Sequence, residues 1–149
     1  MKRNNKGFTL IELLIVVAII GIIAAIAIPN LLNAIDRGKQ KRTMADIRSI
    51  GTACESYAID NNFYPVAATM ATLSAVATNV VPIYIKVMPA GDGWRHDFVV
   101  DSTAVEYTIA STGKAGTGAV ARGGATQSFN DAIVFTVGQF VQWPEGVQQ

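Results

Sequence analysis

The sequence predicts an α+β fold in which one long N-terminal helix packs on a small antiparallel β-sheet. Three observations predict this fold. Residues 8–28 form an apolar run, an amphipathic pattern follows as far as Asp60, and four strand-like segments lie in the C-terminal half. The chain has 149 residues, of which 50% are hydrophobic, so it has room for one membrane helix and one small domain.

The apolar run is long enough to cross a lipid bilayer. A helix over residues 8–28 spans roughly 30 Å at about 1.5 Å per residue. Lys2, Arg3 and Lys6 precede the run, and such a basic flank favours a cytoplasmic N-terminus. Glu12 is the only charged residue inside the run. A carboxylate there costs up to about 2.5–3.5 kcal/mol on insertion scales, so Glu12 needs a partner or a task.

A peptidase cut between Gly7 and Phe8 would create such a partner. It would remove the basic leader and leave an α-ammonium on Phe8, which pairs with Glu12 of the same chain or of a neighbour. Two other interpretations compete. In the first, the segment is a secretory signal with a cleavage site at residues 25–27, but the charge of Glu12 in its apolar region argues against this interpretation. In the second, it is an uncleaved membrane anchor.

The basic leader, the glycine and the run Phe8-Thr9-Leu10-Ile11-Glu12 resemble the class III signal of type IV pilins and type II secretion pseudopilins. In that family a membrane prepilin peptidase cleaves after the glycine and methylates the new first residue, and the glutamate aligns subunits in a helical filament. The resemblance therefore implies a pilin-like fold, cleavage between Gly7 and Phe8, N-methylation of Phe8, and a role for Glu12 in subunit assembly.

The predicted helix continues beyond the apolar run. Pro29 removes one backbone hydrogen bond, and Gly21 lowers helix propensity one segment earlier. Because the resemblance includes a proline at this place, we interpret both residues as points where the helix loosens, with a simple kink at the membrane surface as the alternative. The predicted parts are the leader 1–7, the transmembrane and assembly helix 8–30, the amphipathic half 31–60 and the globular domain 61–149.

Charged residues gather in the first part of the amphipathic half: Asp36, Arg37, Lys39, Lys41, Arg42, Asp46 and Arg48. They form either a solvated stretch beside phospholipid or ion pairs between neighbouring helices, and the pattern fits both. Further along, apolar residues recur at spacings of three and four, which predicts a stripe that covers a sheet. The stripe consists of Met44, Ile47, Ile50, Cys54 and Tyr57.

The globular part begins where residues 61–65 end the helix, because asparagine favours turns and a residue before proline avoids the helical region. The alanine-rich segment 67–77 is predicted to be a short helix or an ordered loop. The strand-like segments are residues 97–100, 105–110, 132–137 and 139–143. Residues 111–130 carry five glycines and are predicted to form a surface loop.

The middle of the chain resembles the major pseudopilin of type II secretion systems more closely than a type IV pilin. The shared features are Asp60-Asn61-Asn62-Phe63-Tyr64-Pro65, Tyr84-Ile85-Lys86-Val87-Met88-Pro89 and the turn Asp92-Gly93-Trp94. The resemblance implies a structural subunit of a homo-oligomeric periplasmic pseudopilus, whose partners are prepilin peptidase, an inner-membrane assembly platform and minor pseudopilins. A type IV major or minor pilin that forms a surface fibre is the alternative.

The predicted location follows from the basic flank and from the resemblance. We expect a single-pass inner-membrane protein with a cytoplasmic N-terminus and a periplasmic C-terminal domain. After assembly, the subunit lies in a periplasmic or extracellular filament.

The sequence offers little to stabilise the last loop. Cys54 is the only cysteine, which excludes an intrachain disulfide. The resemblance implies a calcium ion here, held by aspartates and carbonyls, and calcium takes six to eight oxygen ligands. Residues 111–130 contain no acid and do contain Lys114 and Arg122. Asp131 is the one weak candidate for a ligand, so we expect no cofactor.

Neither nucleic-acid binding nor catalysis is expected. Without its leader, the chain carries more acids than bases, which does not favour a nucleic-acid partner. His96 is the only histidine, and neither a metal-spaced cluster nor a nucleophile motif accompanies it or Cys54. The sequence therefore predicts a non-enzymatic protein.

Overall fold

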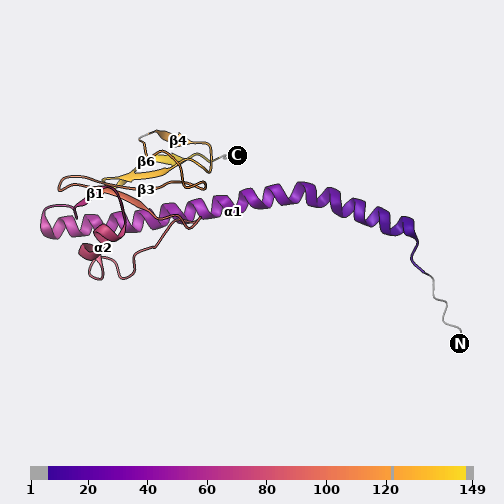
Figure 1. Cartoon of the computed structure of the whole chain (residues 1–149), viewed down its shortest axis with the longest axis horizontal. Coiled ribbons are helices and arrows are strands. Elements are labelled where there is room, and N and C mark those ends of the chain that lie inside the picture. Colours follow the sequence, from indigo (N-terminus) through magenta and orange to yellow (C-terminus); the bar gives the residue numbers. More distant parts are fainter. Residues whose placement is uncertain (1–6, 122, 147–149) are drawn as a thin grey trace, which may run out of the picture. The chain divides into compact units, whose positions relative to one another are not determined.

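The computed structural model describes residues 7–121 and 123–146, so Lys2, Arg3, Lys6 and Arg122 lie outside the described residues. The chain divides into two compact units, Met1–Ile35 and Asp36–Gln149. Figure 1 shows the helices and strands, which follow one another as α1 (Leu10–Asn61), β1 (Ala67–Thr72), α2 (Ser74–Val80), β2 (Val99–Ser102), β3 (Tyr107–Ser111), β4 (Gly124–Thr126), β5 (Ile133–Thr136) and β6 (Gln139–Pro144).

The long helix α1 confirms the predicted N-terminal element. It has 52 residues and includes Pro29 in its interior. Beside the proline, Asn30 Nδ2 donates a hydrogen bond to the carbonyl oxygen of Ile26 at 3.1 Å. The helix ends at Asn61, and Asn62 takes the left-handed conformation with a φ of 64°. Asparagine adopts this conformation more readily than most residues, so the predicted stop signal works as expected.

The sheet has six strands in the order β1-β2-β3-β5-β6-β4. Its neighbouring pairs are antiparallel except β4 and β6, which are parallel. The predicted α+β fold is confirmed, and the sheet is mixed rather than wholly antiparallel. The four strand-like segments of the sequence correspond to β2, β3, β5 and β6.

Two strands were not predicted. The segment 67–77 was expected to be a short helix or a loop, but its first part is β1, and α2 begins only at Ser74. Strand β1 forms because it pairs with β2, with Thr72 opposite Val99, and this pairing overrides the low strand propensity of alanine. Strand β4 lies within the expected loop 111–130 and pairs with β6.

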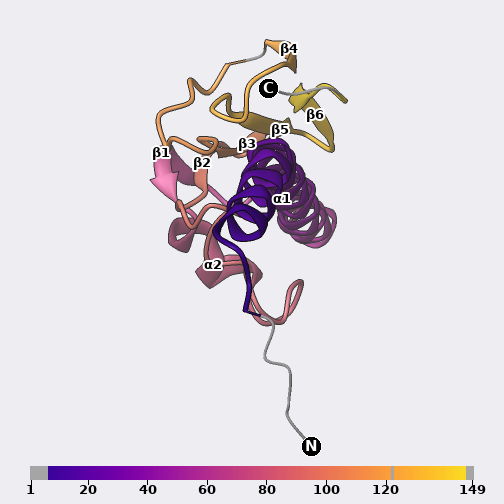
Figure 2. The same cartoon turned by 90° about the vertical axis from the view of Figure 1, so that its right-hand side faces the viewer.

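The core of the second unit lies between α1 and the sheet. Figure 2, in which α1 is seen nearly end-on, shows the sheet along one side of the helix. Ile47, Ile50 and Cys54 of the stripe are buried against residues of the sheet and of α2. These partners are Leu73, Val76, Phe98, Val100, Tyr107, Ile109, Ile133 and Phe135. The stripe is therefore confirmed as a core face of α1.

A glycine and two tyrosines shape the contacts of α1 within the second unit. Gly51 permits a close approach, since a Cβ atom at this position would lie only 2.4 Å from Phe135 Cε1. Tyr57, at the end of the stripe, makes edge-to-face ring contacts with Phe63 and Tyr84. The hydroxyl of Tyr107 donates to Glu55 Oε1 at 2.9 Å, so a buried tyrosine links the sheet to the helix.

Candidate functional site

The N-terminal end of α1 is closed by a reciprocal set of hydrogen bonds between Thr9 and Glu12. The backbone N–H and the hydroxyl of Thr9 donate to Glu12 Oε2 at 2.9 Å and 2.6 Å, respectively. The backbone N–H of Glu12 is 3.3 Å from the Thr9 hydroxyl oxygen, which accepts its hydrogen bond. This arrangement is a capping box, which satisfies N–H groups that the first turn of a helix leaves unpaired.

The capping box gives Glu12 a role that the sequence prediction missed. The Thr-x-x-Glu spacing that signals it is present in the sequence, but the prediction considered only an ammonium partner. Both bonds from Thr9 end on Oε2. A carboxylate has two oxygens with several acceptor positions, so Oε1 keeps capacity for a donor from a second molecule.

Gly7 and Phe8 precede Thr9, the residue before α1, and both are exposed, Phe8 by 75%. The predicted cleavage site is therefore outside regular secondary structure in the described part of the chain. The roles assigned to these residues and to Glu12 remain predictions.

The first unit has an apolar surface that its own chain does not cover. Within α1, the most apolar window of 18 residues has a mean hydropathy of 3.1 and is not buried at all. A Cβ atom on Gly21 would meet no atom within 4 Å. A helix that is apolar all round and exposed needs lipid or other protein chains around it. Length and composition suit α1 to cross a membrane.

The predicted metal ligand Asp131 is used in a local turn. Its Oδ2 accepts a hydrogen bond from the backbone N–H of Ser128 at 3.2 Å. Among the residues that the structure describes, no group of three or more histidine, cysteine, aspartate or glutamate side chains is placed to hold a metal ion.

Asp92 organises the turn before β2, a role that the sequence did not reveal. Its carboxylate is buried and accepts hydrogen bonds from the backbone N–H groups of Trp94 and His96, both at 2.9 Å. It also accepts one from the hydroxyl of Ser111 at 2.6 Å. Asp92 therefore fixes the turn and connects it to the end of β3.

Cys54 is buried in the core, and His96 contacts the loop after β3. Burial, together with the neighbouring charge of Glu55, raises the pKa of the Cys54 thiol to about 12, so the thiol is neutral near pH 7 and is a poor nucleophile. His96 Nδ1 lies 3.0 Å from the carbonyl oxygen of Gly113, where it holds the loop that follows β3.

Comparison with known families connects this geometry to a defined group of proteins. The model of the prokaryotic N-terminal methylation motif matches residues 2–28. The model of type II secretion system protein G matches residues 30–128. The chain belongs to the type II secretion protein G family. The capping box and the first part of α1 thus lie within the residues that match the methylation motif.

Two similar proteins carry the name of this family, and a third is a type IV fimbrial protein. Type II secretion system core protein G of Vibrio cholerae serotype O1 is 34% identical over 114 residues, which cover 72% of this chain and 77% of the relative. The protein of the same name from Escherichia coli K12 is 30% identical over 105 residues, or 65% and 72% of the two chains. The type IV major fimbrial protein FimA of Dichelobacter nodosus is 55% identical over 60 residues, 40% of this chain and 38% of FimA. No solved structure matches.

Proposed function

We propose that this chain is the major structural subunit of a type II secretion pseudopilus. In this proposal, prepilin peptidase cleaves between Gly7 and Phe8 and methylates Phe8. Residues 8–30 hold the subunit in the inner membrane with the C-terminal domain in the periplasm. An assembly platform then adds the subunit to a periplasmic filament that contains minor pseudopilins, and no catalytic step is assigned to the chain.

The observation that carries the proposal is the carboxylate of Glu12 at the start of an exposed apolar helix. Cleavage at Gly7 would place an α-ammonium on Phe8, immediately before the capping residue Thr9. A positive charge at a helix N-terminus is unfavourable with the helix dipole, so a carboxylate beside it is stabilising. Because Thr9 engages only Oε2, Glu12 can cap its own helix and accept the ammonium of a neighbouring subunit with Oε1.

Mass spectrometry of the full-length protein, expressed with its prepilin peptidase, tests the processing step. The expected product begins at Phe8 and carries one N-methyl group. Gly7→Leu should accumulate as the precursor, whereas Gly38→Ala, at an exposed glycine of α1, should be processed normally. A mature chain that retains Met1 or begins at Ile28 would overturn the proposal.

A gene deletion tests the function in secretion. The deletion strain should retain secreted enzymes in its periplasm, and the intact gene should restore their export. Normal export without the gene would contradict the assignment.

The second candidate is a type IV pilin that forms a surface fibre. The identity of 55% to the fimbrial protein of Dichelobacter nodosus favours it, but this match covers only 60 residues. The match to the protein G model extends through residues 30–128 and favours the secretion filament. Loss of surface fibres together with normal protein export in the deletion strain would support the pilin.

A further inference from the structure

The last loop does not offer the ligands of a calcium site. Residues 111–130 contain no acid, and Asp131 already accepts a hydrogen bond from Ser128. The described residues contain no cluster of acidic or histidine side chains that suits a metal ion. Calcium needs six to eight oxygen ligands, several of them anionic, so the ion that the family resemblance implies does not fit this loop.

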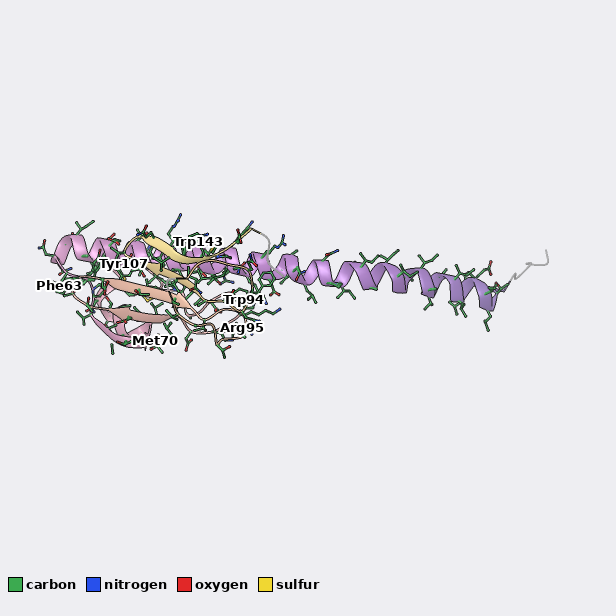
Figure 3. All side chains as sticks on the ribbon, turned by 90° about the horizontal axis from the view of Figure 1, so that it is seen from above. Phe63, Met70, Trp94, Arg95, Tyr107 and Trp143 are labelled. Atoms are coloured by element: carbon green, nitrogen blue, oxygen red, sulfur yellow. The ribbon has the colours of Figure 1, made fainter. Side chains whose placement is uncertain are left out.

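A side-chain cation of the loop is bonded to α1 instead. Lys114 Nζ donates a hydrogen bond to Asp36 Oδ2 at 2.8 Å, and Trp94 Nε1 donates one to Asp36 Oδ1 at 3.0 Å. Asp36 lies on α1, Trp94 in the turn before β2, and Lys114 in the loop after β3. Three segments that are far apart in sequence thus meet at one carboxylate. Figure 3 shows Trp94 at the end of the second unit that is opposite to Phe63.

The backbone around Lys114 is fixed by further hydrogen bonds. The backbone N–H of Lys114 donates to the carbonyl oxygen of Phe129 at 2.8 Å. The preceding Gly113 donates to the hydroxyl of Ser111 and has a φ of 76°, and a Cβ atom at Gly113 would lie 2.5 Å from the carbonyl oxygen of Asn130. These hydrogen bonds therefore fix the backbone of Lys114, from which the side chain extends to Asp36.

The carboxylate of Asp36 needs this cation. Its side chain is only 8% exposed, whereas that of Lys114 is 50% exposed. Burial opposes ionisation of Asp36, but the hydrogen bonds from Lys114 and Trp94 and the charges of Lys114 and Lys39 outweigh it and lower the pKa of Asp36. Removal of the ammonium would leave a buried carboxylate with only the hydrogen bond from Trp94 and the charge of Lys39 to stabilise it, which is more costly than loss of an exposed ion pair.

We propose that the ammonium of Lys114 replaces a metal ion in this chain: it joins the last loop to α1 through Asp36, so that the domain folds and stays folded without calcium. We call the contacts among Lys114, Asp36 and Trp94 the clasp. The proposal concerns how the loop is held and stands independently of the secretion role.

Thermal unfolding of the full-length protein in detergent micelles tests the clasp. In a Trp143→Phe background, the fluorescence of Trp94 reports the environment of the clasp itself. We expect the same Tm with a chelator and with millimolar calcium, because an ion that does not bind the folded state cannot stabilise it. A fall in Tm with the chelator that calcium reverses would overturn the proposal.

A substitution at Lys114 provides a second test of the clasp. Lys114→Met should lower the Tm by about 4–8 °C, the shift expected for roughly 1 kcal/mol in a small domain, and should alter the emission of Trp94. Lys41→Met, at an exposed lysine of α1, is the matched control and should change neither quantity. Equal behaviour of the two variants would refute the clasp.

A double variant separates the ion pair from simple loss of packing. Lys114→Met removes the ion-pair partner of Asp36, and Asp36→Asn then removes the charge that lost its partner. The decrease in Tm of the double variant should therefore be smaller than the sum of the decreases in the two single variants. Strict additivity would show that the two side chains do not interact and would also refute the clasp.

Discussion

The two units of this chain contain parts of the same helix, and these parts differ in how far their apolar side chains are exposed. Between Leu10 and Ile35, α1 exposes its large apolar side chains, for example Leu14 by 61% and Ile22 by 64%. After Asp36, the same helix buries Ile47 and Ile50 completely beneath the sheet. The second unit supplies its own covering, whereas the first has an apolar surface suited to lipid or to other subunits.

The polar groups show the same contrast. Thr9 and Glu12 satisfy each other but use only one carboxylate oxygen. Asp36 and Asp92 bind donors with both of their oxygens, and all of these donors come from the second unit. The second unit thus satisfies its buried carboxylates internally, whereas the capping box of the first unit leaves acceptor capacity on Glu12 Oε1. Four experiments test this comparison.

The largest effect on filament assembly is expected at Glu12. Glu12→Gln keeps the capping box, because glutamine also serves at this position, but it removes the charge. We expect normal processing, an unchanged Tm and a loss of filament yield of at least about tenfold, which corresponds to about 1.4 kcal/mol. Electron microscopy of sheared filaments measures the yield, with Ile11→Leu as the control. Wild-type yield from Glu12→Gln would reduce the role of Glu12 to capping.

The same chemical change should act differently in the two units. Ile47→Ala leaves a cavity in the core and should lower the free energy of unfolding by about 2–5 kcal/mol. Ile23→Ala, at a residue that is 61% exposed, should leave that free energy unchanged. Urea unfolding in micelles, followed by tryptophan fluorescence, measures both variants. A similar loss for Ile23→Ala would mean that the first unit contributes to the stability of the second.

Two glycines of α1 provide a finer test. Gly51→Ala places a methyl group against Phe135 and should destabilise the domain by about 1–3 kcal/mol. Gly38→Ala meets no atom within 4 Å and should stabilise the helix by about 0.5–1 kcal/mol. Opposite signs in urea unfolding would confirm the close approach of helix and sheet at Gly51, whereas equal signs would contradict it.

The smallest effect on stability is expected when the pH is lowered. Because the pKa of Asp36 is lowered in the folded state, its contribution to stability is present above the unfolded pKa of about 3.9 and is lost as the pH falls through the lower folded value. With Lys114 half exposed, this contribution is at most about 1 kcal/mol. The Tm difference between wild type and Asp36→Asn should therefore shrink below pH 4. A constant difference from pH 7 to pH 3 would argue against an ionised Asp36.

Local patterns predicted most of the fold. The apolar run, the stripe with Ile47 and Ile50, and the stop at Asn61 depend on neighbours along the chain, and each was visible in the sequence. Strands β1 and β4 were not, because their residues become strands only by pairing with β2 and β6. Alanine and glycine carry no strand signal of their own.

The candidate site was predictable to a similar degree. Gly7, Phe8 and Glu12 were singled out by their resemblance to the prepilin signal, and their roles stay predictions. Asp36 was placed in a charged stretch with either a solvated or an interhelical role, yet it is buried and bonded to Lys114, 78 positions away in the sequence. No local pattern links two such residues, since only the path of the chain through the sheet brings them together.

The burial of Cys54 has a practical consequence. A thiol that is 1% exposed and neutral at physiological pH reacts with a maleimide only after the core between α1 and the sheet has opened. Because Cys54 is the only cysteine of the chain, the rate at which the purified protein is labelled in micelles reports this opening. The labelling rate of Cys54 can therefore be used to compare the opening of this core in wild type and in each of the variants above.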